Sequence, residues 1–399
     1  MSEPIGPKTR SERPSYYPAL DGVRAVLLVW VLLRHFNHFW TPENFAERLY
    51  LVIPNLAVPA LDVFFAMSGF LITGILLDTK ARPRYFQNFY ARRVLRILPP
   101  YYAFLTIWFL VLPQVPLFRD MATPFREQAW YWFHALNFRL VIVGEQLQDP
   151  QLYHLWSLAF EEQFYLLWPA VVFALSSPAL LRLCGVAFVA ALAWRIGVVV
   201  TGTEHVVGFV LLPARLDSLA AGAALALLVR QPGWFDWLVP RARIVLAASF
   251  ATILGLIAAR RSFLPNDPVI LSVGLTVAAI FSVSAVASVL RLERRSLAGM
   301  FLLHPVTMRV GGWTYAAYIW HWPVETVALH LGLDYRAFYA FFGNRIAGQL
   351  CYWAVLFVGS VGMGALSWYA IEAQCLKLKR FFSYRTAPHG AGVLSGGVG

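Results

Sequence analysis

Ten stretches of this sequence are apolar enough and long enough to cross a lipid bilayer as helices, and no other feature limits the fold so strongly. They lie near residues 18–40, 57–77, 99–115, 155–176, 180–201, 208–229, 243–260, 268–290, 313–333 and 346–371. About 20 apolar residues in a helix span the hydrocarbon layer, where every backbone polar group needs an internal partner. The predicted fold is therefore all-α: a polytopic integral membrane protein of about ten transmembrane helices.

The charge distribution favours a membrane protein over a nucleic-acid-binding protein. Only 14% of the 399 residues are charged, against about 25% in soluble domains, yet the net charge is +12. Most Lys and Arg residues fall in cytoplasmic segments if the N-terminus is inside, as the positive-inside rule requires. We therefore expect both termini in the cytoplasm and no nucleic-acid partner.

The chain is predicted to form one membrane domain over residues 17–375, with no soluble domain. A cytoplasmic tail at 1–16 precedes it, and a Gly- and Ser-rich, disordered cytoplasmic tail follows at 376–399. Residues 130–143 are apolar but interrupted by polar side chains, and we interpret them as a re-entrant or interfacial piece outside the membrane. The three cysteines lie far apart, so neither a disulfide framework nor a metal cluster is expected.

Arg24 and His35 lie eleven residues apart in LDGVRAVLLVWVLLRH. One helix would present both on the same face, roughly 16 Å apart along its axis. Ionisable side chains at membrane depth are unfavourable and by default mark a path for a substrate, a proton or a ligand. Further polar residues are predicted in neighbouring spans, at or near the depth of His35: Asp62, Ser68, Glu161, Arg215 and Asp217.

The predicted inner face carries Arg92, Arg93 and Arg96 in FYARRVLRILPPYY. Guanidinium groups bind phosphate bidentately. A coenzyme A thioester has phosphates at one end and an acyl group at the tip of a long arm. A neutral histidine can take a proton from a hydroxyl and return it to a thiolate. These residues suggest acyl transfer with His35 as general base.

Several of these polar residues also fit different roles. Asp21 either pairs with Arg24 or caps the first helix. His321 and Glu325, four residues apart, either form a structural pair or act in catalysis. A transporter or flippase that binds its cargo among the buried polar groups, or a non-catalytic membrane scaffold, would also fit.

Six segments, in order, resemble the membrane acyltransferase-3 family of bacterial O-acyltransferases over residues 17–375. They are LDGVRAVLLVWVLLRH, LDVFFAMSGFLITGILL, FYARRVLRILPPYY, LWSLAFEEQFYLLWP, LPARLDSLAAGAALA and YAAYIWHWPV. The resemblance implies a bacterial inner-membrane enzyme that moves an acyl group, often acetyl, from cytosolic acyl-CoA to a hydroxyl. The acceptor would be a glycan, a lipid-linked sugar or a secondary metabolite. Acetyl-CoA or another acyl-CoA would be a co-substrate, with no permanently bound cofactor or metal.

The resemblance also suggests roles for individual residues. His35 corresponds to the essential histidine and Arg24 to its paired arginine, and we expect Glu161 or Asp62 to orient His35. Donor binding is expected from Arg24, Arg92, Arg93, Arg96, Ser68 and Gly69, and the rest of the pocket from Asp21, Arg215, Asp217 and His321. An alternative within acyl transfer is a membrane acyl carrier that serves a separate transferase.

Overall fold

The computed structural model describes residues 16–144, 146–147 and 149–384, and all regular secondary structure in these ranges is helical. The all-α prediction is confirmed. The long helices are α1 (Pro18–His35), α3 (Ala57–Thr79), α4 (Tyr85–Thr106), α7 (Trp156–Ala174), α8 (Ser177–Val200), α9 (Leu212–Leu228), α10 (Trp234–Arg260), α11 (Leu275–Val289), α13 (Pro305–His330) and α15 (Arg345–Ser367). The short ones are α2 (Phe45–Asn55), α5 (Phe125–Trp132), α6 (Leu136–Val143), α12 (Leu297–Leu302), α14 (Tyr335–Phe342) and α16 (Ala373–Lys377).

Seven helical runs of the described chain are long and apolar enough to span a membrane. They are Phe45–Thr79, Tyr85–Gln114, Ser177–Val200, His205–Leu228, Trp234–Arg260, Ile270–Val289 and Arg345–Phe381. The predicted count of ten stays a prediction. The long helices outside these runs are α1, α7 and α13, which carry His35, Glu161 and His321. Three candidate site residues thus lie in long helices with a weak membrane signal, whereas others, such as Asp62 in α3 and Arg92 in α4, lie in helices with a strong one.

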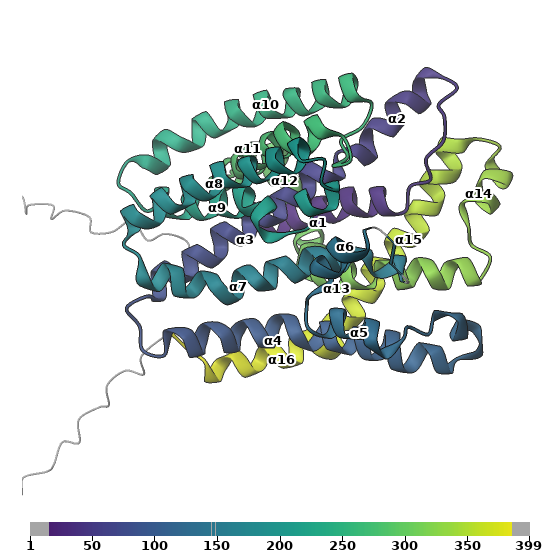
Figure 1. Cartoon of the computed structure of the whole chain (residues 1–399), viewed down its shortest axis with the longest axis horizontal. Coiled ribbons are helices and arrows are strands. Elements are labelled where there is room, and N and C mark those ends of the chain that lie inside the picture. The colour runs from purple at the N-terminus through teal and green to yellow at the C-terminus, as the bar shows by residue number, and fades with distance from the viewer. Residues whose placement is uncertain (1–15, 145, 148, 385–399) are drawn as a thin grey trace, which may run out of the picture.

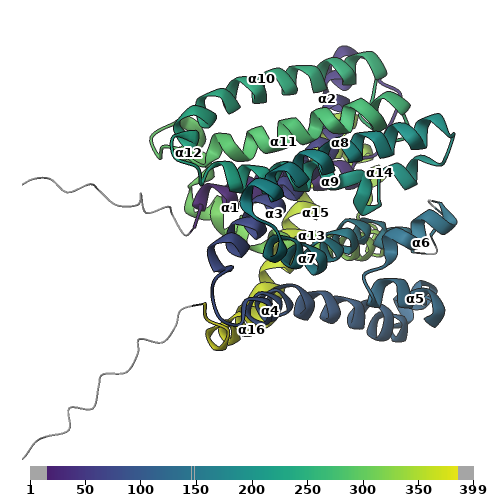
Figure 2. The same cartoon turned by 60° about the vertical axis from the view of Figure 1, so that its left-hand side comes forward.

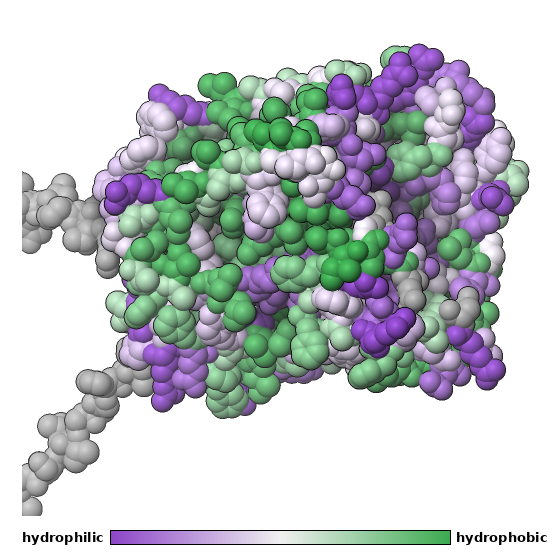
Figure 3. Space-filling view, in the orientation of Figure 1, coloured by the Kyte–Doolittle hydropathy of each residue, from purple (hydrophilic) through white to green (hydrophobic). Residues whose placement is uncertain are grey.

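The helices pack in layers with roughly parallel long axes (Figures 1 and 2). α10 and α11 form one outer layer, α4 and α16 form the opposite one, and α1, α3 and α13 lie between them. Figure 3 shows hydrophobic side chains across much of the middle of one face, with hydrophilic ones gathered mostly towards the two ends. This distribution is typical of a protein whose helices cross a bilayer.

Two glycines allow the central helices to approach closely. A Cβ atom on Gly69 of α3 would lie 2.0 Å from the carbonyl oxygen of Leu219 in α9. One on Gly311 of α13 would lie 1.8 Å from the carbonyl oxygen of Asp21 in α1. Small residues permit such contacts in membrane bundles, where packing drives helix association. Gly69, expected in donor binding, therefore lies in a helix contact, and Gly311 brings α13 against the start of α1.

Two regions refine what the sequence predicts. The segment at 130–143 is divided between α5 and α6, each eight residues long. A helix of that length measures about 12 Å and cannot span the membrane. At the C-terminal end, residues expected to be disordered continue as α16 and a 3₁₀ turn at Leu378–Phe381. Residues 1–15 and 385–399 of the two predicted tails lie outside the described residues.

Candidate active site

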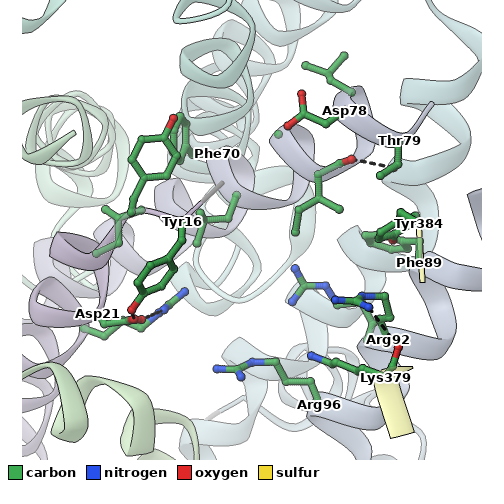
Figure 4. A pocket seen from close by; sticks show the side chains of 18 of the residues that line it. Tyr16, Asp21, Phe70, Asp78, Thr79, Phe89, Arg92, Arg96, Lys379 and Tyr384 are labelled. Carbon is green, nitrogen blue, oxygen red and sulfur yellow. Dashed lines mark hydrogen bonds and ion pairs between the residues drawn. The ribbon is translucent and has the colours of Figure 1, made fainter. Parts of the chain in front are cut away.

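A cavity of about 1370 Å³, here called the wide cavity, lies where the two ends of the described chain meet, since both Tyr16 and Tyr384 line it. Ligand pockets usually measure about 300–1,000 Å³, so this cavity can hold a large molecule. Its cationic lining residues are Arg24, Arg92, Arg93, Arg96, Arg230 and Lys379, and its acidic ones are Asp21 and Asp78. Figure 4 shows Arg92, Arg96 and Lys379 around an open space, with Tyr16 and Asp21 across from them.

Both acidic side chains of the wide cavity are already paired. Asp21 forms an ion pair with Arg24 and accepts a hydrogen bond from the Tyr16 hydroxyl. Burial and this hydrogen bond raise the pKa of Tyr16 to about 12, so that hydroxyl stays a donor at neutral pH. Asp78 pairs with Arg230 at 2.7 Å. Asp21 is thus the partner of Arg24 and not the cap of α1, whose N-cap residue is Tyr17.

The other four cations have no carboxylate partner within the described chain, which leaves the wide cavity strongly basic. Arg93 lies over the ring of Tyr165 at 5.1 Å, and Arg96 over that of Trp368 at 6.0 Å. Arg92 donates hydrogen bonds to the carbonyl oxygens of Lys379 and Phe382, at 3.3 and 3.2 Å. Unpaired guanidinium groups in a concave site favour a polyanion, phosphate above all.

A narrow cavity of about 160 Å³ adjoins the wide one and shares four lining residues with it: Arg24, Leu71, Arg93 and Arg96. Its polar wall is built around Ser68. The Ser68 hydroxyl donates to Glu161 at 3.1 Å and accepts from the Tyr165 hydroxyl at 2.9 Å. Apolar side chains such as Phe64, Phe65 and Ile97 form much of the remaining lining, so the passage suits a thin, mostly uncharged arm.

Ser157 and Tyr318 also line the narrow cavity, and Tyr318 connects it to a group of histidines. The two hydroxyls lie 2.9 Å apart, and the Tyr318 hydroxyl donates to the carbonyl oxygen of His154 at 2.9 Å. The Tyr318 carbonyl oxygen lies 2.6 Å from Nδ1 of His321. His321 Nε2 lies 2.7 Å from Nδ1 of His35, whose ring also stacks on Trp322. His35 therefore packs against α13 at the C-terminal end of α1, and it lines neither the wide nor the narrow cavity.

Asp62, Arg215 and Asp217 form a separate cluster that lines neither cavity. Arg215 donates to Asp62 at 2.8 Å, and Arg195 donates to Asp217 at 2.6 Å. All four side chains are at most 1% exposed. The hydrogen-bond partner of His35 is His321, so neither carboxylate expected to orient it is bonded to it. The polar residues predicted at similar membrane depth therefore fall into two groups. Asp62, Arg215 and Asp217 belong to a buried ion-pair cluster, whereas Ser68 and Glu161 line the narrow cavity.

Several residues of the site were missed by sequence reasoning. Lys379, Ser383 and Tyr384 line the wide cavity, yet they fall in a tail predicted to be disordered. Glu162, Tyr165 and Tyr318 line the narrow cavity. The sequence offered one indication for Glu162 and Tyr165: Glu162 is the residue after Glu161, and Tyr165 lies one helical turn beyond it. Tyr318 had a similar signal, three residues before His321.

Comparison with known proteins identifies the family. A family model described as an acyltransferase domain matches residues 17–370, which is nearly the whole chain. The chain belongs to this acyltransferase family. Membership confirms the resemblance drawn from the six motifs.

O-acetyltransferases are among the similar proteins, and three of them are described here. The peptidoglycan O-acetyltransferase OatA of Listeria monocytogenes is 29% identical over 346 residues, which is 80% of this chain and 51% of the relative. The O-acetyltransferase OatA of Staphylococcus aureus is 27% identical over 332 residues, 78% of this chain and 51% of the relative. The putative peptidoglycan O-acetyltransferase YrhL of Bacillus subtilis is 34% identical over 175 residues, 41% of this chain and 24% of the relative. The chain thus spans about half the length of the OatA relatives, and no solved structure matches it.

Proposed function

We propose that this acyltransferase-family protein moves an acyl group, acetyl in the first instance, from a coenzyme A thioester to a hydroxyl of a carbohydrate or glycolipid. The observation that carries the proposal is that the basic wide cavity and the narrow cavity adjoin and share four lining residues. A phosphate-bearing head fits the first, and a thin arm fits the second. Peptidoglycan is the acceptor to test first, because two of the relatives are named for it.

The donor would bind with its phosphates among Arg92, Arg93, Arg96 and Lys379. Arg24 stands at the junction of the two cavities, where its ion pair with Asp21 fixes its direction. The arm would then run past Ser68 and Glu161 towards Tyr318. Both ends of the described chain lie at the wide cavity, and the positive-inside pattern favours the cytoplasm for that end, where coenzyme A is available.

His35 would act as the general base. Arg24 and His35 are eleven positions apart in α1, roughly 16 Å along the axis, so the donor head and the reacting group would lie at different levels of one helix. The acceptor hydroxyl loses its proton to His35 and its oxygen bonds to the thioester carbon. The carbon–sulfur bond then breaks, and the thiolate takes the proton back from His35.

The test is transfer of label from [¹⁴C]acetyl-CoA by the full chain in proteoliposomes supplied with glycan strands. Labelled ester on the glycan, lost in His35→Ala, is the expected result. Label that accumulates on the protein without reaching any glycan would instead favour an acyl carrier for a separate transferase. Solute uptake without an acyl donor would favour a transporter. Mass spectrometry of surface glycans from deleted and complemented cells would identify the natural acceptor by a missing acetyl group.

A further inference from the structure

Three imidazole rings from distant parts of the chain meet beyond the narrow cavity. His35 ends α1, His321 lies in the middle of α13, and His154 lies in the 3₁₀ turn Pro150–Leu155. The rings of His35 and His321 stack with centroids 4.8 Å apart, and His154 meets His321 edge to face at 4.6 Å. The sequence analysis expects His35 and His321 in one pocket, but it gives no reason to add His154.

The hydrogen bonds of His321 determine which of its nitrogens carries the proton. Nδ1 lies 2.6 Å from the carbonyl oxygen of Tyr318, and a carbonyl oxygen can only accept. Nδ1 of His321 must therefore be the N–H donor. In a neutral imidazole the other nitrogen is then an acceptor, so His321 Nε2 presents a lone pair to His35.

The tautomer of His321 in turn determines that of His35. Nδ1 of His35 lies 2.7 Å from the lone pair on His321 Nε2, so Nδ1 of His35 carries the proton and donates it. Nε2 of His35 is then the basic nitrogen. A chain of two hydrogen bonds, from His35 to His321 to the Tyr318 carbonyl, thus selects one tautomer at the residue proposed as the base.

We propose that His321 is a positioning residue that holds His35 in the tautomer with a basic Nε2. The inference rests on the proposed function of His35 as general base. When Nε2 takes the proton of the acceptor hydroxyl, His35 becomes an imidazolium whose Nδ1–H still donates to His321. This hydrogen bond is stronger when its donor, the His35 ring, is charged. His321 therefore also stabilises the imidazolium form of His35 that the reaction requires.

Two neighbouring groups cannot take the place of His321. Glu325 accepts a hydrogen bond from the Tyr352 hydroxyl at 2.7 Å, so its partner is not His321. Neither ring nitrogen of His154 has a hydrogen-bond partner within the described chain, so its ring acts through packing.

Two variants that differ by one methylene group test the proposal. In His321→Gln the amide oxygen can reach the place of Nε2 and accept from His35, whereas in His321→Asn the amide is too short. We expect His321→Gln to keep turnover within about tenfold of the wild type. His321→Asn should lose roughly 10²–10⁴-fold in kcat, the range for loss of general-base function, with an unchanged Kd for coenzyme A.

Full activity in His321→Asn would overturn the inference. So would equal losses in both variants at unchanged thermal stability, because the acceptor atom would then be irrelevant. If either variant fails to fold, nitrogen NMR of histidine-labelled wild-type protein decides the matter. The inference requires a protonated Nδ1 and an unprotonated Nε2 on His35, and the reverse pattern would refute it.

A failure of the proposed function gives a different result. A wild-type rate of acyl transfer in His35→Ala would refute the role of His35 as general base, whatever the rates of the His321 variants. Loss in His35→Ala together with normal rates in both His321 variants would remove only the positioning role. His330→Gln is the matched control: it makes the same change at an exposed histidine at the end of α13, whose Nδ1 also lies 2.7 Å from a backbone carbonyl oxygen, and it should keep wild-type turnover.

Discussion

The Arg92 guanidinium donates a hydrogen bond to the carbonyl oxygen of Lys379, at 3.3 Å, and so joins α4 to the last turn of the described chain. A second hydrogen bond reaches the carbonyl oxygen of Phe382, and the guanidinium lies 5.4 Å from the centre of the Tyr384 ring. These contacts hold the C-terminal segment against the wide cavity, where Lys379 adds a cation that no motif contains.

Lys379→Ala should weaken coenzyme A binding by roughly 10- to 100-fold, because a hydrogen bond to a charged group contributes about 1.5–3 kcal/mol. Isothermal titration with coenzyme A measures the change. Lys377→Ala is the matched control: it removes the same charge two residues away, from a side chain that bonds to Gln374 and does not line the cavity. Equal effects of the two variants would refute a specific role for Lys379.

Arg24 and Asp21 should have opposite effects on the donor. Arg24→Ala removes a cation from the junction of the two cavities and should raise the Kd for acetyl-CoA about tenfold or more. Asp21→Asn removes the paired carboxylate instead and should leave the Kd unchanged or lower it. An unchanged Kd in Arg24→Ala would exclude this arginine from donor binding.

His35→Ala should reduce acyl transfer by roughly 10²–10⁴-fold without changing coenzyme A affinity, since the ring is proposed to act on the acceptor hydroxyl and does not line the wide cavity. Membrane fractions should contain normal amounts of the variant. His38→Ala provides the comparison, because that exposed ring stacks on Tyr335 and makes no contact with His321 in the structure. Similar losses in both variants would point to damage of the helix end.

Asp62 should matter for stability more than for chemistry. Asp62→Ala leaves Arg215 buried without its counter-ion, which typically destabilises a protein by about 3–5 kcal/mol. Asp236→Ala breaks an exposed pair with Arg291 and should change stability by only about 0–1 kcal/mol. Urea unfolding in detergent compares the two. The rate of acyl transfer per folded molecule should be unchanged in Asp62→Ala. A loss of that rate would instead indicate a catalytic role for Asp62.

The corner between α5 and α6 should become less stable in acid. His134 has a φ of 51° and stacks on Tyr101 at 4.1 Å, and burial lowers its pKa to about 4 from an ordinary 6.5. Between these values the unfolded segment binds a proton that the folded one excludes, so stability falls as the pH drops from about 6.5 towards 4. Limited proteolysis of residues 125–143 should accelerate at pH 5 relative to pH 7.5. Asparagine tolerates the same backbone conformation but does not titrate in this range. In His134→Asn the cleavage rate should therefore be the same at pH 5 and pH 7.5.

Helix positions followed closely from the sequence because hydropathy and length are local properties. Each of the ten predicted stretches overlaps a long helix of the structure, although α4 begins at Tyr85 and not near residue 99, and Arg24 and His35 share α1 as their spacing indicated. The ordered turn at Leu378–Phe381 did not follow, because its order depends on Arg92, almost 300 positions earlier in the chain.

The partners of the buried polar residues could not be read from residue types or approximate depth. The sequence predicts Asp62, Glu161 and Arg215 in neighbouring spans at or near the depth of His35. In the structure Asp62 and Arg215 neutralise each other, while Glu161 receives the Ser68 hydroxyl in the narrow cavity. Which acid meets which base depends on how the helices rotate about their axes, and the sequence pattern leaves that rotation undetermined.

The sequence by itself determined an all-helical membrane protein of the acyltransferase family, with arginines grouped near one end of the spans and a histidine eleven residues from Arg24. Only the tertiary structure decided that His35 meets His321, 286 positions away, and that the C-terminal turn completes the basic cavity. The physical reason is the distance along the chain over which each interaction acts. Helix formation and membrane insertion depend on neighbouring residues, whereas a hydrogen bond between two imidazoles requires two helices packed to within a few tenths of an ångström.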